Sequence, residues 1–96
     1  MNKNFIKILI KHNCTQKDFE KHFLFKKNNN VIVEFDQDNP TKDQLEFLNN
    51  FKKQSKKSIV IISRVLKNKK CLFSIVPTYQ EALDIIEIEE IERLIS

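Results

Sequence analysis

Residues 71–81 read CLFSIVPTYQE, which is a short apolar run, then Pro-Thr, then the start of an acidic helical pattern that continues toward residue 96. The apolar run is typical of a buried strand, and Pro77 ends it. Thr78 can accept a hydrogen bond from the backbone N–H of Glu81, and the Glu81 carboxylate can accept one from the Thr78 N–H, which predicts a reciprocal capping box. The segment therefore predicts a strand that leads directly into a capped helix.

The same joint occurs twice more in the chain. Pro40-Thr41 stands three residues before Gln44, and Thr15 stands three residues before Asp18 without a proline. Threonine at a helix start accepts hydrogen bonds that the first backbone N–H groups would otherwise lack. Repeated joints between apolar runs and capped helices predict a small α/β domain.

The predicted element order is β-α-β-α-β-β-α in a single domain, residues 1–96, with a four-stranded, mostly parallel sheet. The continuous apolar run Ser58–Ser63 predicts a central strand covered on both faces. The link from Ser63 to Cys71 is too short for a full helical crossover, which leaves the pairing of the last two strands open. Other predicted elements are strands Phe5–Lys11, Val31–Phe35 and Cys71–Val76, helices Gln16–Lys27 and Thr41 to about Lys57, and a terminal helix, with Phe19/Phe23, Phe47/Phe51 and Leu83/Ile86 facing the sheet.

The composition excludes several kinds of site. The 96 residues include no glycine, which excludes P-loop and dinucleotide-type phosphate loops, because those loops need backbone without a side chain beside the phosphate. Cys14 and Cys71 have no ligand-like neighbours and predict free thiols in a reducing compartment. Lys7 splits the apolar amino-terminal segment, which predicts a strand rather than a signal peptide. We therefore expect a cytoplasmic protein with no cofactor, metal ion or membrane span.

Charge is divided unevenly along the chain. Residues 1–70 hold 16 basic and 7 acidic side chains, whereas residues 71–96 hold one base, Arg93, and six acids. Such opposed regions can pair within one fold, pair two copies or attract separate partners. One alternative function is weak RNA or DNA binding through a lysine-rich face, although the sequence has little arginine and lacks exposed aromatics interleaved with the lysines for base stacking. That face would use the lysines at positions 52, 53, 56, 57, 67, 69 and 70.

Several features from Val31 onward occur together in one known family. They are a strand Val31–Phe35 that closes into an acidic loop, the helix Thr41–Lys57, the strand Ser58–Ser63, and a strand-cap-helix ending with Glu81-Ala82-Leu83. In these features the chain resembles the STAS family, the small α/β modules typified by anti-sigma-factor antagonists. The closing segment is similar to short STAS-like proteins of Bacteroidota that are often labelled ribonuclease Z. The resemblance implies a regulatory module that acts through protein contacts.

The resemblance also bears on named residues. Partner-switching STAS domains carry a phosphorylated serine in an Asp-Ser-Ser-Gly-like motif where this chain has Asp38-Asn39-Pro40-Thr41, so Thr41 is a candidate phosphoacceptor, with a plain helix cap as the competing interpretation. A ribonuclease Z needs a two-metal site of clustered histidines and aspartates, whereas this chain has only His12 and His22. We therefore expect no catalytic residues, with His22 partly buried on its helix and His12 exposed.

The terminal helix carries two sets of apolar positions that do not share a side. At about 100° per residue, the first set comprises Tyr79, Ala82, Leu83 and Ile86, and the second is rotated from it by more than a quarter turn. Either the helix breaks near Glu87–Glu89 and folds back, or the second set is an exposed apolar patch with an acidic rim, the usual form of a contact site. We expect this second set to bind a protein partner or a second copy, and it comprises Ile88, Ile91, Leu94 and Ile95.

Overall fold

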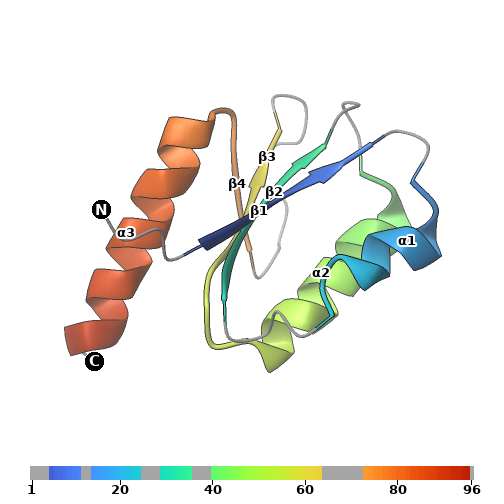
Figure 1. Cartoon of the computed structure of the whole chain (residues 1–96). Coiled ribbons are helices and arrows are strands. Elements are labelled where there is room, and N and C mark those ends of the chain that lie inside the picture. Colours follow the sequence, from blue (N-terminus) through green and yellow to red (C-terminus); the bar gives the residue numbers. More distant parts are fainter. Residues whose placement is uncertain (1–4, 12–13, 25–28, 36–39, 64–72, 96) are drawn as a thin grey trace.

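The computed structural model describes residues 5–11, 14–24, 29–35, 40–63 and 73–95. These residues form β1 (Phe5–Ile10), α1 (Gln16–Lys21), β2 (Asn30–Phe35), α2 (Lys42–Gln54), β3 (Ile59–Ile62), β4 (Ser74–Val76) and α3 (Tyr79–Ile95). The four strands make one parallel sheet in the order β1-β2-β3-β4 (Figure 1). The predicted α/β fold, the element order and the central position of β3 are confirmed.

The last two strands, whose pairing the sequence left open, are parallel. Val60 pairs with Ser74 and Ile62 pairs with Val76, and the backbone N–H of Ser63 donates to the Val76 carbonyl at 2.8 Å. The described strands therefore follow one another across the sheet in chain order. Open α/β sheets usually bind ligands where the strand order reverses, and this described sheet has no such point.

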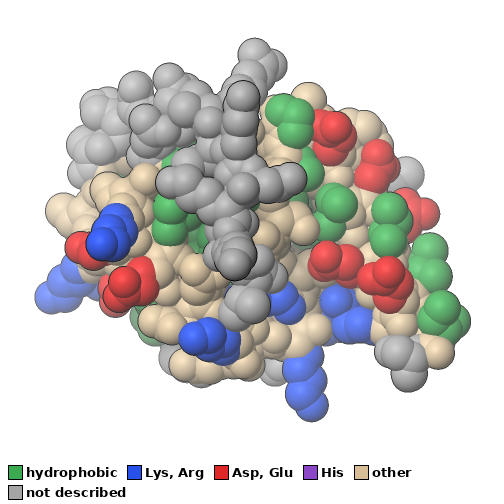
Figure 2. All heavy atoms as spheres, turned by 180° about the vertical axis from the view of Figure 1, so that it is seen from behind, with side chains coloured by type: hydrophobic (Ala, Val, Ile, Leu, Met, Phe, Trp, Pro, Cys, Tyr) green, Lys and Arg blue, Asp and Glu red, His purple; other side chains and the backbone are tan. Residues whose placement is uncertain are grey.

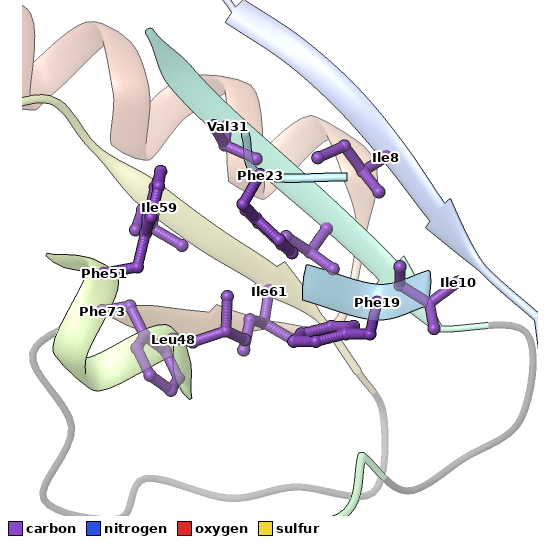
Figure 3. Packing of buried hydrophobic residues seen from close by; sticks show 11 residues of the cluster. Ile8, Ile10, Phe19, Phe23, Val31, Leu48, Phe51, Ile59, Ile61 and Phe73 are labelled. Atoms are coloured by element: carbon purple, nitrogen blue, oxygen red, sulfur yellow. The ribbon is translucent and has the colours of Figure 1, made fainter. Parts of the chain in front are cut away.

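Each face of the sheet has its own core. Strands added in one direction through right-handed crossovers place their helices on one face, and α1 and α2 share a face while α3 covers the other (Figure 1). Under α3, Ala82 and Ile86 pack with Ile32, Val60 and Ile62. The face under α1 and α2 buries a larger cluster (Figure 3), made of Ile8, Ile10, Phe19, Phe23, Val31, Val33, Leu48, Phe51, Ile59, Ile61 and Phe73.

The phenylalanines predicted to face the sheet do so. The Phe23 ring lies 5.1 Å from the Phe19 ring and 5.3 Å from the Phe51 ring, measured between centroids. Phe47 is partly buried against the same cluster, and its ring centroid lies 5.7 Å from that of Phe19. Aromatic pairs at these distances contribute beyond the area they bury, so the rings join α1 to α2 as well as to the sheet.

The capping box that the sequence predicts is present at Thr41, whereas the hydrogen bonds at Thr78 differ from the predicted ones. The Thr41 hydroxyl accepts from the Gln44 N–H at 3.0 Å, and the Thr41 N–H donates to Gln44 Oε1 at 2.8 Å, a complete capping box. The Thr78 hydroxyl accepts from the Glu81 N–H at 3.2 Å, but the Glu81 carboxylate accepts from that hydroxyl, at 3.0 Å, instead of from the Thr78 N–H. A hydroxyl can donate one hydrogen bond and accept another at the same time. Thr78 and Glu81 are therefore joined by two hydrogen bonds, both of which use the Thr78 hydroxyl.

Two helices end earlier than predicted. α1 ends at Lys21 and continues as a turn, in which the N–H groups of Phe23 and Leu24 donate to the carbonyls of Glu20 and Lys21 at 3.1 and 3.3 Å. Phe23 lies in this turn and its side chain is buried in the core. The four-residue spacing between Phe19 and Phe23 therefore did not require the helix to continue to Phe23. α2 ends at Gln54, and the Lys52 ammonium donates to the Lys57 carbonyl at 2.8 Å beyond that end.

Candidate functional site

The second apolar set of the terminal helix is exposed. α3 is a single helix from Tyr79 to Ile95, so the predicted alternative of a break near Glu87–Glu89 is wrong. We call the four residues of this set the α3 patch: Ile88, Ile91, Leu94 and Ile95, with exposed fractions of 53%, 51%, 84% and 80%. By contrast, Ala82 and Ile86 in the first half of the helix are 0% and 5% exposed.

Polar side chains hold the second half of α3 to the sheet. Glu89, Glu90 and Arg93 continue, at helical spacing, the inward face that Ala82 and Ile86 begin. They meet Asn30 and Ser58 at the amino ends of β2 and β3, and these two partners are only 1% and 0% exposed. We call the five polar residues the polar anchor: Asn30, Ser58, Glu89, Glu90 and Arg93.

The polar anchor is a connected hydrogen-bond network. Asn30 Nδ2 donates to Glu90 Oε1 at 3.0 Å, while Asn30 Oδ1 accepts from the Ser58 N–H at 2.8 Å and from Arg93 Nη2 at 3.1 Å. Arg93 also donates through Nη2 to Glu90 Oε2 at 2.9 Å and through Nη1 to Ser58 Oγ at 3.2 Å. The Ser58 hydroxyl in turn donates to Glu89 Oε1. Hydrogen bonds are directional, so the network fixes the rotation of the helix about its axis.

The charges of the polar anchor favour the ionised carboxylate of Glu90. The hydrogen bond from Arg93 lowers the pKa of Glu90, and burial opposes that change. The Asn30 amide lowers the pKa further, as do the positive charges of Lys57, whose Nζ lies 4.0 Å from Glu90 Oε2, and of Arg93. Glu90 therefore stays negatively charged at neutral pH and remains bonded to Arg93.

With the inward face fixed, the opposite face of α3 is apolar with an acidic rim. Asp84, Glu87 and Glu92 are exposed beside the α3 patch. Arg93, the only basic residue in α3, belongs to the polar anchor on the inward side. Figure 2 shows apolar and acidic side chains interleaved along the side of the molecule that α3 forms. The outward face thus has a negative rim without a compensating base from its own helix.

The described lysines of α2 are mixed with acids rather than set apart as a cationic face. Lys52 and Lys56 line a shallow groove of about 360 Å³ together with Glu89, Glu92 and Arg93. Lysines attract a nucleic-acid backbone by neutralising phosphates, and neighbouring carboxylates oppose that attraction. The lysines at 67, 69 and 70 lie outside the described residues.

A second, larger pocket of about 560 Å³ lies at the carboxyl end of β1. We call it the Leu9 pocket, and its lining comprises Leu9, Lys11, Cys14, Asp18, Lys21 and His22. His22 was predicted to be partly buried and is exposed, because α1 ends at Lys21 and only the next residue, Phe23, turns into the core. Burial raises the pKa of the Cys14 thiol and the Asp18 charge raises it further, which disfavours the nucleophilic thiolate.

The other residues singled out in the sequence do not join a site. Thr41 is exposed, and its hydroxyl oxygen accepts the capping hydrogen bond from Gln44; its phosphorylation stays a prediction. His12 lies outside the described residues. Among the residues that the structure describes, no three His, Cys, Asp or Glu side chains are grouped to hold a metal ion. Nor does any helix in this part of the chain combine the length and apolar character needed to cross a bilayer.

Sequence reasoning missed the polar anchor. In the sequence, Asn30 is the last of three consecutive asparagines, which are typical of a helix end. Glu89 and Glu90 stand beside the second apolar set, where acids are expected to form its rim. One signal was present: positions 82, 86, 89 and 93 follow the i, i+3/i+4 spacing of a single helix face, although the face changes from apolar to polar. No family model matches this chain, and no curated protein or solved structure matches it either.

Proposed function

We propose that the protein is a non-catalytic, cytoplasmic interaction module that binds a protein surface through the α3 patch. The observation that carries this proposal is that four large aliphatic side chains, 51–84% exposed, lie together on a helix fixed from behind. A group of apolar side chains with a charged rim is the usual composition of a protein contact site. The resemblance to STAS domains, which act through protein contacts, supports the same role, as part of the proposal.

Two features of the described residues favour a contact role over chemistry. The thiol of Cys14 has a raised pKa, and the sheet offers no reversal of strand order at which a ligand crevice would form. The alternative of nucleic-acid binding has less support, because acids of α3 share the groove of Lys52 and Lys56. Among the described surfaces, the α3 patch is therefore the one that best fits a protein contact.

The test compares two double-serine variants of the tagged chain in capture from native-cell lysate treated with nuclease. The patch variant carries Ile88→Ser and Ile91→Ser, and the control carries Asn50→Ser and Gln54→Ser on the exposed side of α2. Isoleucine, asparagine and serine have similar helix propensities, and Gln54 is the last residue of α2, so we expect both variants to keep the wild-type melting temperature. We expect the wild type and the control to retain the same bound protein and the patch variant to lose it.

Two outcomes contradict the proposal. A patch variant that retains the same bound protein as the wild type shows that the contact lies elsewhere. A patch variant that melts well below the control shows that Ile88 and Ile91 belong to the core. Retention of nucleic acid that falls steeply with added salt, in the absence of a bound protein, would favour the lysine-face alternative instead.

A further inference from the structure

We propose that the α3 patch binds the Leu9 pocket of a second copy of this chain, so that copies associate head to tail. This inference rests on the proposed function, because it names the partner of the same patch. Its basis is that the two surfaces are complementary in apolar character and in charge and lie too far apart to meet within one chain.

Within the part of the chain that the structure describes, exposed apolar side chains are concentrated at the α3 patch and near the carboxyl end of β1. Among the described residues, the large hydrophobic side chains that are exposed are the four of the α3 patch together with Leu9, Leu24 and Tyr79. Tyr79 is already engaged, since its ring lies 6.2 Å from the Phe5 ring and 4.7 Å from Lys7 Nζ. That leaves Leu9, which lines the pocket, and Leu24, which closes the turn after α1. Within the described residues, the Leu9 pocket is thus a hollow with an exposed apolar side chain, Leu9, that can receive the patch, and its rim is mostly polar or charged.

The rims of the two surfaces carry opposite charge. Asp84, Glu87 and Glu92 flank the α3 patch, whereas Lys11 and Lys21 line the Leu9 pocket beside a single acid, Asp18. Opposite charges on the rims of two surfaces attract the surfaces to each other and fix how they align. A pocket of about 560 Å³ also has room for aliphatic side chains projecting from a helix.

A symmetric contact between two α3 patches is disfavoured by the same charges. In a twofold contact the same patch meets itself, so the acidic rims of both helices would face each other. Arg93 is the only base in α3, and it bonds Glu90 and Asn30 on the inward side. Lys52 and Lys56 of α2 share a groove with Glu92 and offset part of this repulsion, whereas α3 itself provides no outward base beside Asp84 and Glu87.

The positions of the two surfaces require a second molecule. The α3 patch lies on the half of the helix that is bonded to the amino ends of β2 and β3 through Asn30 and Ser58. The Leu9 pocket lies at the carboxyl end of β1, beside α1, and α1 and α3 lie on opposite sides of the sheet (Figure 1). Each copy consequently presents one surface of each kind, and such contacts build rings or open chains.

Sedimentation velocity at low ionic strength tests the proposal with two variants that each damage one surface. The patch variant carries Ile88→Ser and Ile91→Ser, and the pocket variant carries Lys11→Glu and Lys21→Glu. We expect the wild type to grow in mass with concentration and each variant alone to stay monomeric. An equimolar mixture should form a complex of one copy of each that does not grow further, because the patch variant keeps its pocket and the pocket variant keeps its patch.

The control carries Lys42→Glu and Lys53→Glu, which make the same change of charge on exposed positions of α2, and we expect it to associate like the wild type. A pocket variant that dimerises alone reveals a symmetric contact and overturns the proposal. A wild type that stays monomeric at millimolar concentration also overturns it; the proposed function would then still stand if the patch variant loses its captured protein in the lysate experiment.

Discussion

The two halves of α3 lie on the same sheet but are held to it by different forces. In the first half, Ala82 and Ile86 pack on Ile32 and Val60, an apolar contact that has no preferred direction. In the second half, side chains such as Arg93 make hydrogen bonds of 2.9–3.2 Å, whose geometry allows one rotational setting. The second half is therefore held in place without its isoleucines, which remain on the outside.

The difference also bears on what the polar anchor contributes. The Arg93 and Glu90 side chains are 30% and 28% exposed. Removing charged groups even partly from water costs free energy that their mutual attraction only partly returns, so this ion pair is weak evidence of stability. The chain could have placed an apolar residue at position 93 and used Ile91 or Leu94 in the core. In the second half of α3 the inward face is polar instead. The consequence is a defined orientation of the α3 patch rather than a larger core.

The largest expected effect comes from the sheet beneath both halves. Ile61 is 0% exposed in the cluster under α1 and α2. Ile61→Asp would bury an unpaired charge at a cost of several kcal/mol, which is of the order of the whole stability of a small domain. We expect no cooperative thermal transition by circular dichroism, and a soluble variant that melts cooperatively would contradict the arrangement of the sheet.

A matched pair of alanine substitutions separates the two halves of α3 directly. Ile86 is 5% exposed and Ile88 is 53% exposed, on the same helix and with the same side chain. We expect Ile86→Ala to lower the free energy of unfolding by about 2–5 kcal/mol. Ile88→Ala should change it by less than about 0.5 kcal/mol. Urea titration of both variants measures the difference, and equal losses would show that the outer isoleucine is part of the core.

Ser58→Ala tests the polar anchor. The substitution removes the hydroxyl that donates to Glu89 and accepts from Arg93, and it leaves each of these half-buried charged side chains with one hydrogen bond fewer. We expect a loss of about 1–3 kcal/mol in the free energy of unfolding. The matched control, Glu92→Gln, changes an exposed acid of the same helix. Urea midpoints that are the same for the two variants would show that the network does not hold the helix.

The smallest expected effect is the dependence of stability on pH at Glu90. The pKa of Glu90 is lowered in the folded chain, mainly by the hydrogen bond from Arg93. Its contribution to stability is therefore present above the ordinary glutamate pKa of about 4.3 and is lost as pH falls through the lowered value. Urea midpoints measured from pH 6 to pH 2.5 should fall less steeply for Glu90→Gln than for the wild type. Identical slopes would exclude this role of Glu90.

Much of the fold could be predicted because its signals are local in sequence. Each of these signals depends only on neighbouring residues in the chain. They include the caps at Thr15 and Thr41, the buried phenylalanines and the apolar run at 59–62. The end of α1 could not be predicted in this way, since Phe23 reaches the core equally well from a helix or from a turn. The parallel pairing of β4 depends on contacts with β3 rather than on its own residues.

The candidate site was predictable only on its exposed side. The two apolar sets of the helix are visible in the sequence because they differ in angle. The polar anchor is not, because Asn30 bonds a residue 60 positions later in the chain and Ser58 bonds one 35 positions later. Asparagine and serine before a strand ordinarily indicate a turn, and only the fold brings Arg93 to them.

The accessibility of isoleucine methyl groups, measured by NMR with a soluble paramagnetic relaxation agent, tests the central claim most directly. In dilute wild-type protein we expect strong relaxation enhancement at the methyl groups of Ile88, Ile91 and Ile95 and weak enhancement at those of Ile86 and Ile32. The enhancement at the first three should fall when the patch binds its partner. Weak enhancement at Ile88 and Ile91 in the dilute monomer would mean that the chain itself covers them, and it would contradict the account of α3 as a contact surface.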